Sequence, residues 1–278
     1  MSSYHAKIGM KGSTLNIVDK GSSNGTKLIS VETGASSVGT ILAPINKPSR
    51  YNVGGHGLLL VGTDRGVPKP GENEGANQDG VSILKDSKGD FSLFVVDGIG
   101  GRSGGNIAKD CSQEVFSDYI LNSGSSIGAG GLNTQIAKRL GEVEGVGKSG
   151  IAHCAINLKD GKYVTGVQTG DVRAIVIKKD GSVEQLSKDE VNPKKKNMIT
   201  NFILPNTPGQ ETPIKNYVMG KGDRLVISSD GLFDTYSNEE VADFLKKPKL
   251  LGDIDKQWGK LDKQWGNKMS NGEQKSCR

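Results

Sequence analysis

The chain has 278 residues, and its 36 basic and 31 acidic side chains give a formal net charge of +5, too small an excess to indicate a nucleic-acid-binding protein. Hydrophobic residues make up 34% and aromatic residues 5%, so we expect a core built mainly of aliphatic side chains. Forty glycines are about twice the usual share of ~7%, which favours a fold rich in turns over a helical bundle.

The N-terminal part of the chain differs in composition from the rest. Residues 1–57 are rich in Gly, Ser and Asn, and we interpret them as an extension to a domain over residues 58–278. Alternating apolar and polar residues predict one strand in this extension, at Thr14–Asp19. The following Gly21–Thr26 resembles the phosphopeptide-binding loop of forkhead-associated domains. We favour a hairpin turn there, because the extension is too short for such a domain.

Short apolar, β-branched runs follow one another from residue 58 onward, and each is bounded by turn residues. The turns at 159–162 and 179–182 contain Asp-Gly, which accepts the positive φ angles of tight hairpins. Consecutive hairpins predict antiparallel sheet. The predicted strands are Val81–Leu84, Phe91–Asp97, Ile151–Leu158, Tyr163–Thr169, Ala174–Lys178 and Arg224–Ser229.

Three segments show helical periodicity instead. Apolar residues recur at helical spacing between Ile107 and Tyr119, and Asn133 is placed to cap a second helix. Ser237–Glu240 resembles a capping box ahead of a third. Helices segregated from antiparallel strands predict an α+β fold.

Three acidic motifs lie at the ends of predicted strands. Asp79 leads into one strand, Asp97 ends another within Val-Val-Asp-Gly-Ile-Gly-Gly, and Asp230 follows a third within Ser-Asp-Gly-Leu-Phe-Asp. A carboxylate in this place lies at a sheet edge beside backbone carbonyls, and Mg²⁺ and Mn²⁺ prefer such oxygen ligands. A single Asp-Gly is chiefly a turn signal, but three such motifs together indicate a metal site.

The order and flanks of these motifs resemble the metal-dependent Ser/Thr protein phosphatases of the PPM, or type 2C, family, and bacterial members in particular. The resemblance implies a β-sandwich of two antiparallel sheets flanked by helices, in four layers, with metals at one end. It covers about residues 60–245 through the stretches Val95–Gly101, Gly104–Ala108, Gly166–Ala174, Leu186–Glu190, Asn197–Thr200 and Gly222–Asp234.

The resemblance also implies a site for two Mn²⁺ or Mg²⁺ ions, with a third, looser ion in some relatives. Asp97 and Asp230 would be catalytic, with Asp97 bridging both ions and the Gly98 carbonyl binding the second. A water that bridges two such cations loses a proton near neutral pH and attacks phosphorus in line. The implied activity is removal of phosphate from phosphoserine and phosphothreonine in proteins. The other implied metal ligands are Asp79, Asp171 and Asp234.

Several residues depart from the family pattern. Gln78 stands where many relatives have Glu, and Ile99 replaces the His that eukaryotic members use to protonate the leaving group. Arg65 or Lys69 would have to bind the substrate phosphate. Near the C-terminus only Asn267–Ser270 resembles the terminal Asp-Asn motif. These changes leave an alternative open, a catalytically impaired relative that binds a phosphoprotein or a regulatory partner.

The unusual C-terminal end leads to one structural hypothesis. A sandwich that lacks its terminal core strand exposes an unpaired edge, which folded proteins normally pair or cover. Thr14–Asp19 is the candidate to fill that place, with Asp19 approaching the metals.

Cysteine spacing and the first residues bear on the cellular compartment. Cys111, Cys154 and Cys277 are widely spaced, which predicts neither a disulfide framework nor a zinc site. Residues 1–10 lack the apolar segment of a signal peptide, and the apolar runs are too short to span a membrane. We expect a cytoplasmic protein that acts on phosphoproteins and does not bind nucleic acid or membranes. Secretion without a cleaved signal is the alternative.

Overall fold

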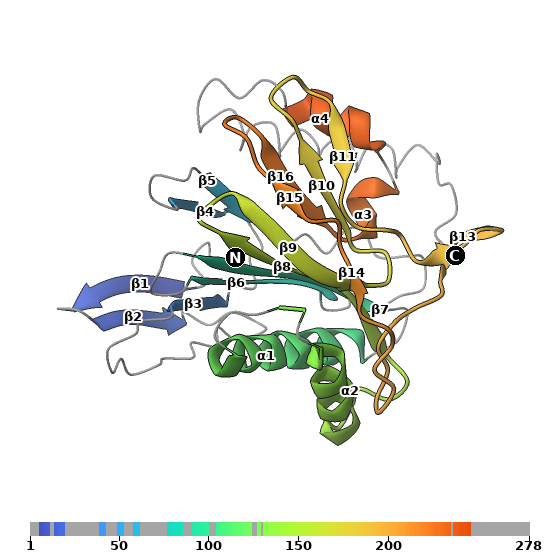
Figure 1. The fold of residues 1–278 in the computed structure, drawn as a ribbon. Helices are drawn as coiled ribbons and strands as arrows, with labels where there is room; N and C mark the ends of the chain where they lie inside the picture. Colours follow the sequence, from blue (N-terminus) through green and yellow to red (C-terminus); the bar gives the residue numbers. More distant parts are fainter. Residues whose placement is uncertain are drawn as a thin grey trace, which may run out of the picture.

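Two facing antiparallel sheets form the centre of the molecule in a computed structural model of the chain (Figure 1). The structure describes residues 6–11, 14–19, 39–42, 49–52, 58–61, 77–85, 90–99, 104–123, 127–128, 130–234 and 236–245. The larger sheet has seven strands in the order β14-β9-β8-β7-β6-β3, and β15 also pairs with β9. Its strands are β3 (Gly39–Leu42), β6 (Asp79–Lys85), β7 (Phe91–Ile99), β8 (Gly150–Lys159), β9 (Tyr163–Thr169), β14 (Thr212–Pro213) and β15 (Tyr217–Val218).

The smaller sheet has three strands in the order β11-β10-β16, which are β10 (Arg173–Ile177), β11 (Val183–Gln185) and β16 (Arg224–Ser228). The other described strands form two-stranded ladders. These pair β1 (Ala6–Lys11) with β2 (Thr14–Asp19), β4 (Ser49–Asn52) with β5 (Leu58–Val61), and β12 (Val191–Asn192) with β13 (Lys195–Ile199).

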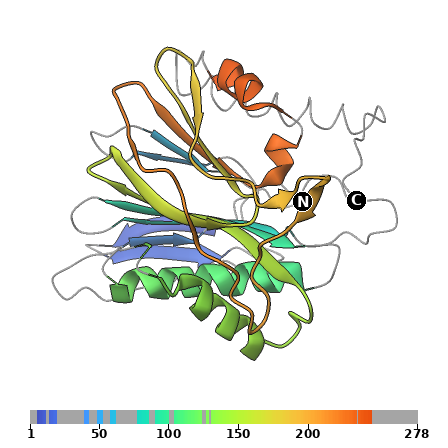
Figure 2. The same cartoon turned by 45° about the vertical axis from the view of Figure 1, so that its right-hand side comes forward.

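Helices cover both outer faces of this sandwich. The helices α1 (Gly105–Ser123) and α2 (Leu132–Glu142) lie on the larger sheet, and α3 (Asp230–Phe233) and α4 (Asn238–Leu245) lie on the smaller one (Figures 1 and 2). This αββα arrangement confirms the predicted α+β sandwich. None of the helices in the described part of the chain is long and apolar enough to cross a membrane.

The strand β7 is buried on both of its faces, because it lies between the helices and the second sheet. Phe94 and Val96 pack in one apolar cluster with α1 and α2. Leu93 and Val95 alternate with them and pack in a second cluster between the two sheets. A third cluster joins the outer face of β10 to α3 and α4.

The local signals of the turns and of α4 are confirmed. Asp160 and Gly161 have φ of 51° and 65°, as a tight hairpin requires. At the start of α4, the Glu240 N–H donates to Ser237 Oγ (3.1 Å) and the Ser237 N–H donates to Glu240 Oε2 (2.8 Å), which is the expected capping box.

The predicted cap of α2 is wrong. The helix begins at Leu132, and its N-cap is Gly131 with φ of 108° and no side-chain cap bond. The side chain of Asn133 is buried and donates instead to Thr169 Oγ1 (2.8 Å). The Asn133 side chain, which the sequence predicted to cap its own helix, therefore forms a tertiary hydrogen bond instead.

The N-terminal extension joins the sandwich through a different strand from the one predicted. Thr14–Asp19 is a strand, but it pairs with β1, from Ala6↔Asp19 to Lys11↔Thr14. β3 is the strand that lies beside β6 in the larger sheet. Only two residues separate β1 from β2, so a local hairpin forms at lower entropic cost than a pairing with a distant strand.

Residues 267–270, which were compared with the terminal Asp-Asn motif, lie outside the described residues.

Candidate active site

Asp79 and Asp97 lie opposite each other at one end of the larger sheet, because they are paired in the β6–β7 ladder. Side chains of a strand alternate between its faces, so Asp97 shares a face with Val95, and Asp79 shares one with Ile83. Both apolar residues belong to the cluster between the sheets. The two carboxylates therefore lie on the face that looks toward the smaller sheet.

The end of β16 brings acidic residues to the same place from the smaller sheet. The Ser229 hydroxyl donates to Asp79 Oδ2 (3.0 Å) and so ties the ends of the two sheets together. The next residue, Asp230, is the first of α3, and Asp234 follows the helix with its N–H on the Asp230 carbonyl (2.7 Å). The sequence predicted Asp230 and Asp234 here but gave no role to Ser229.

Asp171 reaches the site through a turn that requires glycine. Gly170 has φ of 94°, and a Cβ on it would lie 2.5 Å from the Cβ of Ala152. Ala152 is the β8 partner of Asp97, so this turn runs directly beside the site. Asp171 Oδ1 is buried and has no hydrogen-bond partner among the described residues. A cation would satisfy this oxygen.

Glu190 holds the Asp171 turn in place. Its carboxylate accepts hydrogen bonds from the Gly170 N–H (2.8 Å), the Asn201 amide (2.7 Å) and the Thr212 hydroxyl (2.6 Å). The sequence matched Glu190 to a family segment without giving it a function. The structure shows that it fixes the backbone next to a predicted metal ligand.

Arg173 links the same turn to α3 and α4. Its guanidinium forms an ion pair with Asp189, donates to Asn238 Oδ1 (3.0 Å) and lies 4.5 Å from the centre of the Phe233 ring. Guanidinium stacked on an aromatic ring while paired with a carboxylate is held in one orientation. These contacts position α3, which carries Asp230.

The aspartates interact strongly through their charges. Burial raises the pKa of Asp97 well above its usual value, and the negative charges of Asp79, Asp230 and Asp171 raise it further. Burial likewise raises the pKa of Asp171 to about 7, with Asp230 adding to the effect. For Asp79 burial raises the pKa to about 6, although the Ser229 hydrogen bond opposes this. A cation in this place would relieve the repulsion.

The donors suit a hard divalent ion but do not form a closed ligand set. Within the described ranges, no three or more His, Cys, Asp or Glu side chains are arranged to hold a metal. The acidic groups are close enough to shift one another's pKa without meeting at one point. All of them offer carboxylate oxygen, and one buried oxygen of Asp171 has no hydrogen-bond partner in the described part of the chain. This chemistry fits Mg²⁺ or Mn²⁺.

The backbone around Gly98 explains why a glycine follows Asp97. A Cβ on Gly98 would lie 2.5 Å from the Gly105 carbonyl oxygen, because β7 ends directly against the first turn of α1. The Gly98 N–H donates to the Gln78 carbonyl (3.0 Å). A Cβ on Gly105 would lie 2.8 Å from the Gln78 side-chain amide, so this side chain packs against the start of α1.

The predicted phosphate-binding residues Arg65 and Lys69 lie outside the described residues.

Most of the sequence matches a known family. The family model described as protein phosphatase 2C matches residues 72–267. The chain belongs to the protein phosphatase 2C family. No curated protein sequence matches the chain.

Solved structures of bacterial phosphatases share the fold of this family member. The S. agalactiae serine/threonine phosphatase is 19% identical with a TM-score of 0.57, and the match covers 84% of this chain and 93% of that one. Stp1 from Staphylococcus aureus is 17% identical with a TM-score of 0.57, over 87% and 94% of the two chains. The Mycobacterium tuberculosis phosphatase PstP/Ppp is 19% identical with a TM-score of 0.51, over 83% and 93%. A PstP catalytic domain in complex with two manganese ions matches with the same TM-score of 0.51.

Proposed function

We propose that this protein phosphatase 2C member hydrolyses phosphoserine and phosphothreonine in proteins and uses two Mn²⁺ or Mg²⁺ ions to do so. One observation carries the proposal. Aspartates from the ends of both sheets lie near one another and raise one another's pKa, as the ligands of a cation site would without its cation. The two manganese ions of the similar PstP catalytic domain agree with this choice of metal.

Each aspartate has a role in the proposed site. Asp97 and Asp230 would hold the ions from the two sheets, and Asp79 and the Gly98 carbonyl would supply further oxygen ligands from the larger sheet. Asp171 and Asp234 would hold a third, looser ion. Bound ions of this kind supply a water of lowered pKa as the nucleophile and offset the charge of the phosphoryl oxygens.

The described cysteines and histidine do not offer a protein nucleophile or acid. Burial raises the pKa of Cys154 to about 12 and that of Cys111 to about 11, so both are protonated thiols near pH 7. Burial lowers the pKa of His153 to about 3, so its ring is neutral. The reaction proposed here needs none of them, because the nucleophile is a water.

A second candidate function is phosphoprotein binding without turnover. Two observations favour it: the acidic groups of the described chain form no closed ligand set, and Gln78, next to Asp79, is neutral.

Hydrolysis of p-nitrophenyl phosphate separates the two functions. We expect turnover that needs Mn²⁺ and stops on addition of EDTA, because the proposed nucleophile forms only on bound metal. A folded protein with no turnover at saturating Mn²⁺ and Mg²⁺ would favour the binding function. Folding is checked by circular dichroism in the same buffers.

A further inference from the structure

Lys109 is a buried cation beside the proposed metal site. It lies on α1 and is 9% exposed. Its ammonium donates to the Asn77 carbonyl (3.2 Å) and forms an ion pair with Asp110 Oδ1 (3.0 Å). A buried lysine is uncommon unless it is paired, so its place in this structure calls for an explanation.

The route of the Lys109 side chain is set by a glycine next to Asp79. A Cβ on Gly80 would lie 2.9 Å from Lys109 Cγ, so the aliphatic stem crosses β6 where that strand has no side chain. The stem brings the ammonium to Asn77, two residues before Asp79. Its charge also lowers the pKa of Asp79, against the larger effect of burial.

The ion pair with Asp110 does not cancel this charge at the site. The side chain of Asp110 is 64% exposed, whereas that of Lys109 is 11% exposed. Solvent screens the exposed carboxylate more strongly than the buried ammonium. The positive charge of Lys109 therefore acts mainly toward the interior, where Asp79 lies.

Two features act in the same direction on this side of the site. Gln78 brings no negative charge, and its side chain packs against the first turn of α1. Lys109 adds a positive charge near Asp79. This side of the site is therefore less negative than it would be with carboxylates at both positions 78 and 79, and it attracts a divalent cation less strongly.

We propose that the Lys109 ammonium is a built-in counter-ion on the Asp79 side of the site, which weakens binding of the second divalent ion and separates the affinities of the two ions. The inference rests on the proposed function in that it assumes a two-ion site. Its consequence is regulatory: the site fills completely only at a Mn²⁺ concentration set by the weaker ion, and hydrolysis follows that concentration.

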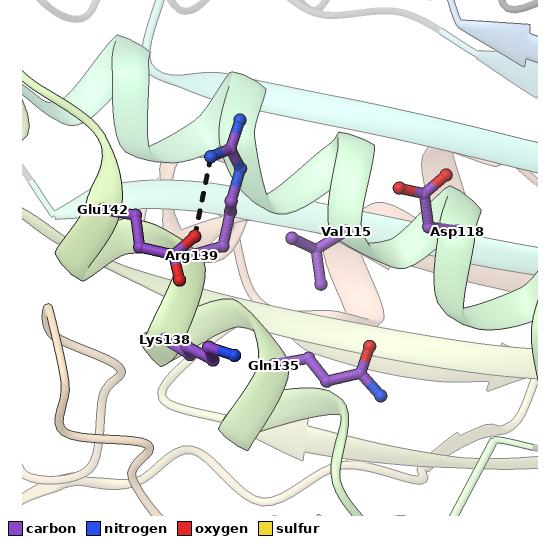
Figure 3. A pocket seen from close by; sticks show the side chains of 6 residues that line it. All are labelled: Val115, Asp118, Gln135, Lys138, Arg139 and Glu142. Atoms are coloured by element: carbon purple, nitrogen blue, oxygen red, sulfur yellow. Dashed lines mark ion pairs between the residues drawn. The ribbon is translucent and has the colours of Figure 1, made fainter.

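The test is a Mn²⁺ titration of the full chain by isothermal calorimetry, which needs no turnover. Lys109→Met keeps the apolar stem and removes the charge, and Lys109→Arg keeps the charge. The matched control is Lys138→Met, because Lys138 is an exposed lysine of α2 in the groove between α1 and α2 (Figure 3), and none of the proposed metal ligands lines that groove.

We expect two Mn²⁺ dissociation constants in the wild type that differ by about tenfold or more, where tenfold is about 1.4 kcal/mol. Lys109→Met should lower the larger constant by about tenfold and leave the smaller one nearly unchanged. Lys109→Arg and Lys138→Met should behave as the wild type does.

Two equal constants in the wild type would overturn the inference without any variant, and so would an unchanged weaker constant in Lys109→Met. If Lys109→Met does not fold, Lys109→Gln provides the same test with a polar end for the Asn77 carbonyl. Failure of the proposed function looks different: two ions bind with the expected constants and no substrate is hydrolysed. A wild type that binds no Mn²⁺ would overturn both.

Discussion

Gln78 is the residue at which this chain departs most directly from a fully acidic metal site. Its backbone carbonyl accepts from Gly98, so its main chain is held against the site, while its side-chain amide packs at the start of α1. An amide oxygen is a weaker ligand for a hard cation than a carboxylate is. The residue thus provides a direct test of which side chains face the metals.

Gln78→Glu should lower the Mn²⁺ concentration that gives half of full activity, because it adds an anionic oxygen near the second ion. We expect a change of about tenfold, the effect of about 1.4 kcal/mol. Gln135→Glu adds the same charge at an exposed position of α2 and is the control. An unchanged or higher Mn²⁺ requirement in Gln78→Glu would show that this side chain does not contribute to the site.

Single residues also show the limits of sequence reasoning. Asp79, Asp97 and Asp230 are predictable, because each stands at the end of an apolar run with a known periodicity. Lys109 and Ser229 are not, because their contacts with Asn77 and Asp79 join residues 32 and 150 positions apart. Only the folded backbone brings such pairs together.

At the scale of elements, the Gly170 turn between β9 and β10 carries Asp171 to the site. Gly170→Ala should destabilise the protein by about 1–3 kcal/mol, because φ is 94° and the new Cβ would lie 2.5 Å from the Ala152 Cβ. Gly130→Ala is the matched control, since φ there is 78° and nothing lies within 4 Å of a new Cβ. Urea unfolding should show the larger loss at Gly170. Equal losses would mean that backbone strain alone acts and that the close packing against β8 does not matter.

A buried hydrogen-bond chain joins α2 to β8 and β9. The ring of His153 bonds Asn133 Oδ1 (2.7 Å), the Asn133 amide donates to Thr169 Oγ1 (2.8 Å), and the Thr169 hydroxyl donates to the Gln210 carbonyl (3.1 Å). The Asn133 amide is a donor to Thr169, so its oxygen faces His153 and the ring donates from Nε2. These hydrogen bonds need a proton on Nε2 only, and Nδ1 is buried with no partner among the described residues, so a charged ring would bury an unpaired N–H and the neutral ring is required.

This requirement predicts a pH effect on stability. Burial lowers the pKa of His153 to about 3 in the folded state, against about 6.5 in an unfolded chain. Below about pH 6.5 the unfolded chain binds a proton that the folded one does not. The free energy of unfolding therefore decreases as the pH is lowered, by about 1.4 kcal/mol per pH unit.

His153→Gln removes the titrating group. The difference in unfolding free energy between wild type and variant therefore reports the pH effect of His153 alone, because the aspartates contribute equally to both proteins. We expect the wild type to lose about 1.4 kcal/mol more unfolding free energy than the variant between pH 6 and pH 5, measured by urea unfolding with EDTA present. Parallel pH profiles for the two proteins would contradict a buried neutral His153.

Most strands and helices were predictable from sequence because their periodicity is strong. β7 and β8 are continuous apolar runs with β-branched residues, and the Asp160–Gly161 turn is a local signal. The start of α2 was not predictable, because Asn133 is used by Thr169 and His153 rather than by its own helix. The edge strand β3 was missed because Gly39–Leu42 is short and lies within a Gly- and Ser-rich segment.

At the scale of the whole molecule, the extension adds an edge strand to the larger sheet. β3 covers one side of β6, from Gly39↔Lys85 to Leu42↔Ser82, and β6 carries Asp79 at its other end. Without β3, the N–H and C=O groups on that side of β6 would lose their partners, and an exposed strand edge promotes association.

Two truncations distinguish the parts of the extension. Deletion of residues 1–20 removes β1 and β2, which pair with each other, so we expect a small change in melting temperature. Deletion of residues 1–42 also removes β3, and we expect a melting temperature lower by several degrees, about 2–4 °C for each kcal/mol lost, together with aggregation seen by light scattering. Equal melting temperatures for the two truncations would contradict the role of β3.

The central claim is that the converging aspartates make a metal-dependent phosphatase, and release of phosphate from a phosphothreonine peptide tests it most directly. The measurement compares wild type with Asp97→Asn at saturating Mn²⁺, with circular dichroism to show that the variant is folded. Asp97 lies opposite Asp79 in the β6–β7 ladder, so loss of its charge removes the carboxylate proposed to hold the ions from the larger sheet. The account predicts Mn²⁺-dependent release by the wild type and less than about a tenth of that rate in the variant, because a lost charged ligand costs more than about 1.4 kcal/mol. Equal rates in the two proteins, or no release by a folded wild type, would contradict it.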